Sequence, residues 1–400
     1  MNAMRRIDLK KAQPAHFSTM RDINRQIVLN YVRERGPISR AEIARESVLQ
    51  RSTISTIVDE LVADALVEEI GEGESTGGRR PTLLRLRASG AAAIGIDITP
   101  TRTTVATSDL AGRVLEREEF ATDPDFEKTI KRAIECVLEI KKRHREGLEG
   151  VGVILPGLVD PCQGKALYIP YFNWRDLEIE RRVSTATGLS VTIDNDANAG
   201  ALAELWFGSP EVSSARDFIM VFVSEGVGTG IIFDGQIYRG TCGAAGEFGH
   251  MIIGERAPVA CSCGSHDCWE AFASGRAALA RYAQLSKKAG SSSLTFAQLI
   301  DRALDGEAAA RAALVVTAKF VSIGISNLIV GFSPELVVVG GSIARAWPLV
   351  AEVFGETVER SVRRGLPTAR IIASTLGEQT TLMGALSLVL ANKFAYASSI

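Results

Sequence analysis

Between residues 21 and 70 the apolar positions recur with the 3.6-residue period of an α-helix, and three short helices are predicted there. The apolar face of the first helix is formed by Ile23, Ile27, Val28 and Tyr31. The apolar face of the third helix is formed by Ile54, Ile57, Val58 and Leu61. The opposite face of this third helix is polar, so we expect one side to pack and the other to face outward.

The start of the second helix is marked by a capping box. Ser39 precedes Glu42 by three residues, and this spacing lets each side chain bond the other residue's backbone N–H. Ile38 and Ile43 flank the pair at the positions of a hydrophobic staple. The chain is therefore expected to turn into a helix at Ser39.

Two strands are predicted after the helices, at 66–70 and 83–86, around a Gly-rich loop at 71–81. Three helices followed by such a hairpin predict a winged helix-turn-helix DNA-binding domain over residues 17–88. The residues expected to contact DNA from the third helix are Arg51, Ser52, Thr53, Ser55 and Thr56. Those expected to contact it from the wing are Gly77, Gly78, Arg79 and Arg80. The alternative is a winged helix that serves only dimerisation or protein contact.

From residue 91 the pattern changes to apolar strands alternating with helices, which predicts an α/β fold. A strand-turn-strand pattern near 92–120 is repeated near 218–239, so two similar lobes are expected in a domain spanning 91–400. Lobe 1 is predicted to comprise about 91–208 plus the C-terminal helix at 381–400, and lobe 2 about 215–380.

Length and composition agree with two or three soluble domains. The chain has 400 residues, of which 46% are hydrophobic and 23% charged. No apolar run is expected to reach the ~20 residues of a membrane span, and the basic N-terminus does not resemble a signal peptide, so a cytoplasmic location is predicted. Residues 1–89 hold 15 Lys+Arg against 12 Asp+Glu within a chain of net charge −2, a basic bias that suits DNA.

A cluster of cysteines predicts a metal site. Cys261, Cys263 and Cys268 are separated by Gly, Ser, His and Asp rather than by apolar residues, and His250 precedes them. Three thiolates and one imidazole form a closed tetrahedral set that is typical of structural zinc (Zn²⁺). His266, inside the cluster, is the alternative fourth ligand.

Several strings together resemble the ROK family of repressors, open reading frames and kinases. These are VSEGVGTGIIFDGQIYRGTCGAAGEFGH at 223–250, CSCGSHDCWE at 261–270, Asp194–Asn198, and STGGRRP at 75–81. The resemblance extends from about Ile23 to the C-terminus and includes the wing of the family's repressor branch. It implies a two-lobed, actin-like (ribonuclease-H-like) sugar-kinase fold, with a sugar bound in the cleft between the lobes.

The resemblance also implies the roles of individual residues. The sugar ligands would be Gly157, Asn173, Asn195, Asp196, Glu247, His250 and Glu270. Asp196 would be the general base of a kinase, or would only bind sugar. Its neighbours suit a polyol, because carboxylates and amides accept and donate several hydrogen bonds in a fixed orientation.

The phosphate loops depart from those of the family's kinases. Asp97–Arg102 reads DITPTR, which lacks the usual glycines, and Pro100 has no N–H to offer a phosphate. Glu225 adds a carboxylate to the second loop. These changes speak against a functional ATP/Mg²⁺ site and predict a sugar-responsive repressor, a homodimer or homotetramer that binds operator DNA. The alternatives are an active ATP-dependent sugar kinase with an appended DNA-binding domain, and a DNA-binding protein controlled by a protein partner.

Overall fold

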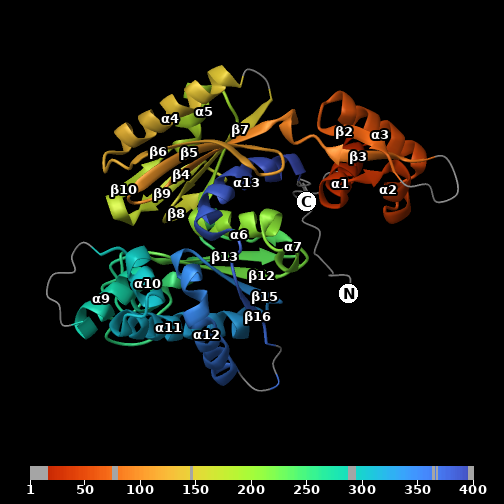
Figure 1. Ribbon diagram of the computed structural model, residues 1–400. Helices are drawn as coiled ribbons and strands as arrows, with labels where there is room; N and C mark the ends of the chain where they lie inside the picture. The colour runs from red at the N-terminus through yellow and green to blue at the C-terminus, as the bar shows by residue number, and fades with distance from the viewer. Residues whose placement is uncertain are drawn as a thin grey trace.

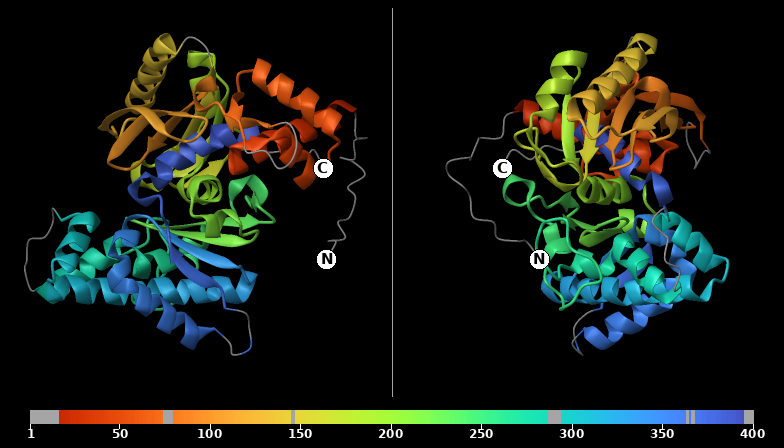
Figure 2. Two further views of the ribbon diagram at one scale, coloured as in Figure 1. Left: turned by 45° about the vertical axis from the view of Figure 1, so that its right-hand side comes forward. Right: turned by 90° about the vertical axis from the view of Figure 1, so that its left-hand side faces the viewer.

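The computed structural model describes residues 17–73, 80–144, 147–286, 294–362, 365 and 368–394. Figure 1 shows a small N-terminal unit, drawn in red and orange, beside the upper of two larger lobes that lie one above the other. The two views in Figure 2 keep this arrangement, with α6 between the lobes.

The N-terminal unit is a winged helix. Its elements are α1 (Phe17–Arg35), β1 (Ile38–Ser39), α2 (Arg40–Glu46), α3 (Arg51–Ala63), β2 (Val67–Glu72) and β3 (Thr82–Leu86). The predicted capping box is confirmed, because Ser39 N donates to Glu42 Oε2 at 2.8 Å and Glu42 N donates to Ser39 Oγ at 3.2 Å. All four predicted apolar residues of α3 are buried in the core of this unit.

Three features of this unit differ from the prediction. Ile27, expected on the apolar face of the first helix, is exposed, while Leu29 and Val32 are buried. The first helix has 19 residues and is not short, because its sequence contains no glycine or proline that would end it earlier. The sheet also has a third strand, since β1 pairs antiparallel with β3 and gives the order β1-β3-β2. Two residues are too few for an alternating pattern, so β1 gave no signal in the sequence.

Lobe 1 is built on a five-stranded sheet of order β11-β7-β4-β5-β6. Its main elements are β4 (Ala92–Ile98), β5 (Arg102–Asp109), β6 (Val114–Ala121), α4 (Phe126–Arg143), β7 (Leu148–Leu155), α5 (Ile179–Thr187), β11 (Val191–Asn195) and α6 (Asp196–Phe207). A small second sheet consists of β8 (Leu158–Asp160), β9 (Lys165–Ile169) and β10 (Trp174–Leu177). The last helix, α13 (Thr380–Phe394), packs on β4, β7 and α6.

Lobe 2 has a five-stranded sheet of order β14-β13-β12-β15-β16. Its strands are β12 (Phe218–Val223), β13 (Val227–Phe233), β14 (Gln236–Ile237), β15 (Leu336–Gly340) and β16 (Arg370–Ala373). Its helices are α8 (Trp269–Ala273), α9 (Gly275–Ser286), α10 (Phe296–Leu304), α11 (Ala308–Phe332) and α12 (Trp347–Ser361), while the short α7 (Pro210–Ser213) precedes the lobe. In both lobes the strand that comes first in the sequence lies at the centre of the sheet. Strand β4 lies between β5 and β7, and β12 lies between β13 and β15. The expected similarity of the lobes is therefore present in the topology.

Helix α11 corrects one expectation. Among the described helices it alone is long and apolar enough, by length and composition, to cross a membrane, whereas no such stretch was expected. Arg311 and Lys319 interrupt the apolar run in the sequence, but both lie on the exposed side of the helix. The apolar 18-residue window is 61% buried, and α11 packs against α8, α9, α10 and α12. Its composition is that of a helix in the core of lobe 2.

The winged helix shares a hydrophobic core with lobe 1. Val28 and Leu29 of α1 belong to the same buried cluster as Leu386 and Leu390 of α13 and Ala203 of α6. Asn30 Nδ2 also donates to the backbone oxygen of Phe394 at 2.9 Å. The N-terminal unit is thus packed onto lobe 1.

Candidate functional site

A cavity of about 350 Å³ lies between the two lobes. Lobe 1 lines it with the loop after β4, Gly157, Tyr171 and the start of α6; lobe 2 lines it with the loop between β12 and β13, with Glu247, and with Glu270 of α8. Thr380 and Thr381, at the start of α13, close another side. The predicted sugar residues in its lining are Gly157, Asn195, Asp196, Glu247, His250 and Glu270.

The junction of β11 and α6 positions Asn195 and Asp196. Asn195 caps α6, because its side-chain oxygen accepts from Asn198 N at 2.8 Å. Its amide nitrogen lies 3.4 Å from the backbone oxygen of Gly157, so the amide is fixed in orientation. Asp196 is the first residue of the helix, where the helix dipole favours a negative charge, and its Oδ1 accepts from Ala197 N at 2.9 Å. Both side chains are therefore held at the cavity by the helix start.

Asp196 and Asp97 are two carboxylates with raised pKa values. Burial raises the pKa of Asp196 to about 7, and the nearby carboxylates of Asp97 and Glu247 add to the shift. Burial raises the pKa of Asp97 to about 6, although a hydrogen bond from Thr381 Oγ1, at 2.7 Å, opposes the change. Asp196 is therefore able to accept a proton from a bound hydroxyl near neutral pH.

Asn173 does not lie among the described residues that line the cavity. It is exposed, and its side-chain oxygen lies 3.2 Å from Arg175 Nε. Its positive φ of 53° ends a short 3₁₀ turn. Tyr171, two residues earlier, lines the cavity instead. Sequence reasoning missed Tyr171, since nothing in the pattern shows which side of this turn faces the cleft.

The predicted metal ligands come together. The ligand atoms of His250, Cys261, Cys263 and Cys268 all lie within 4.8 Å of one another. Cys263 Sγ is 3.8 Å from Cys268 Sγ, and His250 Nδ1 is 3.3 Å from Cys261 Sγ. A tetrahedral ion with Zn–S bonds of about 2.3 Å would separate its sulfur ligands by about 3.8 Å. This grouping contains His250, while His266 is exposed and lies outside it.

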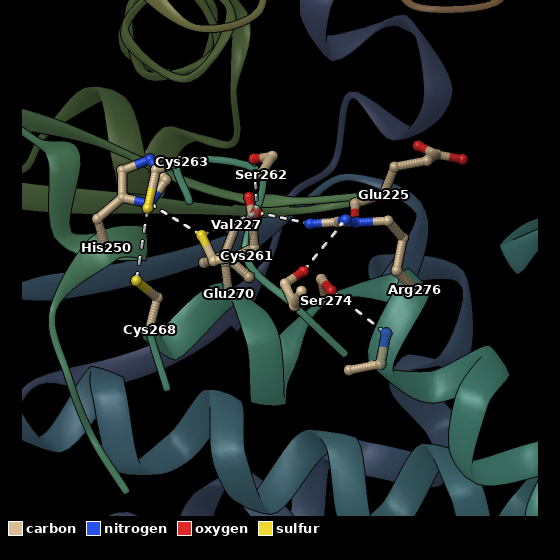
Figure 3. A network of polar contacts seen from close by, with 12 residues as sticks. Glu225, Val227, His250, Cys261, Ser262, Cys263, Cys268, Glu270, Ser274 and Arg276 are labelled. Atoms are coloured by element: carbon tan, nitrogen blue, oxygen red, sulfur yellow. Dashed lines mark hydrogen bonds and ion pairs between the residues drawn. The ribbon is translucent and has the colours of Figure 1, made fainter. Parts of the chain in front are cut away.

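Glu270 joins the metal loop to the cavity, as Figure 3 shows. Its Oε1 accepts from Ser262 Oγ at 3.1 Å and from Arg276 Nη2 at 2.8 Å, while its Oε2 accepts from Val227 N at 3.3 Å. The Cys261 thiol also lies 3.7 Å from Oε1. The position of this carboxylate therefore depends on the conformation of the cysteine loop.

Arg276 was not expected from the sequence. Besides Glu270 it approaches the backbone oxygens of Glu225, at 3.4 Å, and of Ala260, at 3.5 Å. One guanidinium thus connects the cysteine loop, Glu270 and the loop after β12. Arginine, with its five N–H donors, can bridge several acceptors, but no spacing in the sequence predicts that Arg276 makes these contacts.

The loops that would hold phosphate already use several of their backbone donors. Thr99 N donates to the oxygen of Arg102 at 2.9 Å, and Arg102 N donates to Thr99 Oγ1 at 3.1 Å. Ser224 N donates to the oxygen of Gly226, and Ser342 N donates to Ser224 Oγ. Pro100, which lies between Thr99 and Arg102 and lines the cavity, has no backbone N–H to donate. These N–H groups are not free to bind a polyphosphate.

The charge of the lining is also unfavourable for phosphate. The carboxylates that line the cavity are Asp97, Asp196, Glu225, Glu247, Glu270 and Glu378. Arg102 is the only Lys or Arg among the described lining residues, and it lies 3.4 Å from Glu119. In a partly buried cavity the repulsion between like charges is stronger than in water.

The outer face of α3 carries most of the predicted DNA contacts. Arg51, Ser52 and Thr56 are exposed, while Thr53 and Ser55 are half-buried. Gly77, Gly78 and Arg79 of the predicted wing lie outside the described residues. Arg80 is exposed and lies 3.9 Å from Glu72. The surface of α3 is thus open to a partner.

Comparison with known proteins identifies the class of this two-lobed fold. The ROK family profile matches residues 93–392. The xylose repressor of Caldicellulosiruptor bescii is 32% identical over 397 residues, which cover 95% of this chain and 98% of the repressor. The chain belongs to the ROK family. The match to the repressor is too long to leave out the winged helix of this ROK chain, since it covers all but about a twentieth of the chain.

Solved structures agree with the ROK assignment. A ROK family transcriptional regulator, described as a homologue of the E. coli Mlc protein, has a TM-score of 0.80 and 24% identity, and the match covers 94% of this chain and 97% of that one. A ROK glucokinase from Streptomyces griseus, solved with glucose and AMPPNP, has a TM-score of 0.67 and 28% identity. That match covers 74% of this chain and 99% of the kinase. The predicted fold class is therefore confirmed.

Proposed function

We propose that this ROK protein is a sugar-responsive transcriptional repressor that binds operator DNA through its winged helix and a sugar in the cavity between its lobes. The observation that carries the proposal is the full-length similarity to a xylose repressor, which extends over both the winged helix and the two lobes.

The DNA contacts are proposed on the face of α3 and on the wing. The α3 residues are Arg51, Ser52, Thr53, Ser55 and Thr56, and the wing residues are Gly77, Gly78, Arg79 and Arg80. Short polar side chains let a helix enter the major groove and reach the base edges. We propose a homodimer or homotetramer, because paired half-sites about 34 Å apart require two winged helices.

The sugar is proposed to bind Asn195, Asp196, Glu247, His250 and Glu270, beside Gly157. Support comes from the cavity, where an oriented amide and several carboxylates converge within about 350 Å³. Asn173 remains a predicted ligand, but its exposed position offers no support. A sugar bound by both lobes would favour a closed cleft, and its differential affinity for that state would set the size of the response.

We propose Zn²⁺ as the ion held by His250, Cys261, Cys263 and Cys268. Closed sets of three thiolates and one imidazole are typical of structural zinc. The ion would fix the cysteine loop, whose Ser262 and Cys261 contact Glu270. Zinc would therefore act through the orientation of a sugar ligand and not through catalysis.

An active kinase would need to bind ATP. ATP binding is disfavoured because several loop N–H groups are already bonded, Pro100 has no N–H, and Glu225 adds a negative charge. Asp196 is then proposed as a hydrogen-bond acceptor for sugar, without a catalytic duty. A coupled ATP-consumption assay over hexoses and N-acetylated amino sugars tests this point. Turnover near 1 s⁻¹ or above would show a working kinase.

The repressor proposal is tested with the full-length chain. A thermal-shift screen over unphosphorylated sugars should find one that stabilises by about 2.7 kcal/mol at 100 times its Kd. A duplex obtained by in vitro selection then serves to measure DNA affinity at fixed salt, with and without that sugar. Equal affinities for every sugar of the screen, or no selectable duplex, would contradict the proposal.

A further inference from the structure

Two helices begin at the cavity and end at the winged helix. Helix α6 begins with Asp196 in the cavity lining and has Trp206 in its last turn. Helix α13 begins with Thr380, also in the lining, and ends with Phe394. With 12 and 15 residues, they span about 18 and 22 Å at 1.5 Å per residue. Figure 1 shows both helices between the lobes, with the end of α13 beside α1.

The two helices form one packed unit. Ala199 and Leu202 of α6 share a buried cluster with Ala385 and Leu388 of α13. A Cβ atom placed on Gly384 would lie 2.6 Å from the backbone carbon of Ala199, so the two backbones approach as closely as glycine permits. Close-packed interiors have low compressibility and transmit strain. A displacement at the cavity end should therefore appear at the far end of both.

At that far end the pair is met by Arg33 of α1. Its guanidinium carbon lies 4.1 Å from the ring centroid of Trp206 and 5.1 Å from that of Phe394. The two ring centroids are 5.9 Å apart. A cation over aromatic faces is attracted by their quadrupoles, and a cation at helix C-termini is favoured by the dipoles of both helices. Arg33 is 17% exposed; burial lowers the pKa of its guanidinium, and the ion pair with Glu34, 2.8 Å away, opposes that change.

Trp206 takes part in this contact without a hydrogen bond from its indole ring to any of the described residues. Its indole Nε1 is buried. Its ring is therefore held by packing and by the guanidinium, without a directional bond. Such a contact can repack when the helix end shifts.

We propose that Arg33 is the positioning residue that couples the winged helix to the cavity, by holding α1 against the ends of α6 and α13. The inference rests on the proposed function, which supplies the two ligands to be coupled. When sugar draws Asp196 and the start of α13 into a new position, the ends of both helices turn the winged helix with them. Coupling between two sites of this kind is worth about 5- to 150-fold in affinity.

The test compares Arg33→Ala and Arg33→Lys with Arg35→Ala in the full-length chain. Arg35 lies two residues further along α1 and is exposed, so it is a matched control. The ligand probes are D-xylose, D-glucose and N-acetylglucosamine, and the DNA probe is the duplex selected with the unaltered chain. The measured quantity is the ratio of duplex affinities with and without sugar. Direct sugar affinity is measured in parallel by calorimetry.

For Arg33→Ala we expect that ratio to fall to within about twofold of one, while sugar affinity and sugar-free duplex binding change less than about threefold. Arg33→Lys should restore part of the ratio, because it keeps the charge and loses the planar stacking. Arg35→Ala should leave it unchanged. An unchanged ratio in Arg33→Ala would overturn the inference.

Hydrogen exchange gives a second readout that needs neither ligand. In Arg33→Ala the last turns of α6 and α13 and the last turns of α1 should exchange faster together, with the start of α4 as the unchanged reference. Faster exchange in α1 alone would overturn the inference. If no sugar and no duplex bind the unaltered chain while the exchange pattern appears, the proposed function fails and the placement role of Arg33 stands.

Discussion

At the scale of single residues, the raised pKa of Asp196 bears on the proposed binding of sugar in the cavity. Its carboxyl group is desolvated at the start of α6 and lies near a second buried carboxyl group, that of Asp97. A sugar hydroxyl would donate a stronger hydrogen bond to the ionised carboxylate than to the protonated carboxyl group, so binding would favour loss of the proton. This makes sugar affinity depend on pH across the neutral range.

The first prediction concerns that dependence. With a pKa of about 7, the ionised fraction of Asp196 grows about tenfold between pH 6 and pH 8, so sugar affinity should rise by about that factor. Asp196→Asn should bind more weakly and lose the rise, whereas Asp305→Asn, on the exposed end of α10, should keep it. Calorimetric titration at both pH values measures the effect. A pH rise retained in Asp196→Asn would show that another group titrates.

The sequence revealed some of these residues and not others. Ser39 with Glu42, and the three cysteines with His250, are local patterns whose chemistry follows from spacing. Arg276 contacts Glu225, which is distant in the sequence. Tyr171 reaches the cavity because of the direction of one short turn. No periodicity encodes such contacts, and Asn173 was expected where Tyr171 lies.

At the scale of elements, segments with a strong apolar pattern were predicted well. Strands β4 and β12 are buried along almost their whole length, and α3 buries one apolar face. The short strands β1, β8 and β10 were missed because two to four residues carry no pattern. The first phosphate loop was predicted to be degenerate because its glycines are lost, and the second because Glu225 adds a carboxylate. The structure adds a physical observation, because Thr99 N and Ser224 N, one in each loop, donate to backbone oxygens of the same loop.

The second prediction concerns the charge of the ligand. Glucose 6-phosphate and N-acetylglucosamine 6-phosphate should bind more than about tenfold more weakly than the parent sugars, because carboxylates dominate the cavity lining. Glu225→Gln should reduce the difference in affinity between the sugar phosphates and the parent sugars. Glu359→Gln, at an exposed position on α12, should leave that difference unchanged. Competition calorimetry measures both. Equal or tighter binding of the phosphates would disprove the expectation.

The third prediction concerns the cysteine loop. Removing the metal with a chelator, or replacing Cys263 by Ser, should weaken sugar binding at least about tenfold, because the loop whose Cys261 and Ser262 contact Glu270 is no longer fixed. Sugar-free duplex binding should survive, since the loop lies in lobe 2. Cys162→Ser, at an exposed cysteine outside the cluster, is the control. Metal content by mass spectrometry accompanies the binding measurement, and unchanged sugar affinity after complete metal loss would refute this role.

At the scale of the whole molecule, the lobes are joined across the cleft by an ion pair as well as by packing. Arg239, which follows β14 of lobe 2, donates from Nε to Asp194 Oδ2 at 2.8 Å. Asp194 is 1% exposed, and its Oδ1 also accepts from Asn195 N and Asn198 Nδ2. The same carboxylate thus orients a proposed sugar ligand and binds the opposite lobe.

The fourth prediction removes this pair. Arg239→Ala should lower the free energy of unfolding by about 1–3 kcal/mol, because a buried carboxylate loses a charged donor but keeps two others. Arg216→Ala, which breaks an exposed pair with Asp234, should change it by less than about 0.5 kcal/mol. Urea denaturation of both variants measures the difference. Equal stabilities would show that the lobes do not depend on this contact.

The apolar core that α1 shares with α13 limits how such a protein can be recombined. A winged helix cut from this chain would carry Val28 and Leu29 uncovered, and a sensor without it would uncover Leu386 and Leu390. A chimera that joins the DNA specificity of one repressor to the effector specificity of another should therefore exchange the apolar face of α13 along with α1. Helix α13 thus helps to support the proposed DNA-binding unit, although nearly the whole sequence separates it from α1.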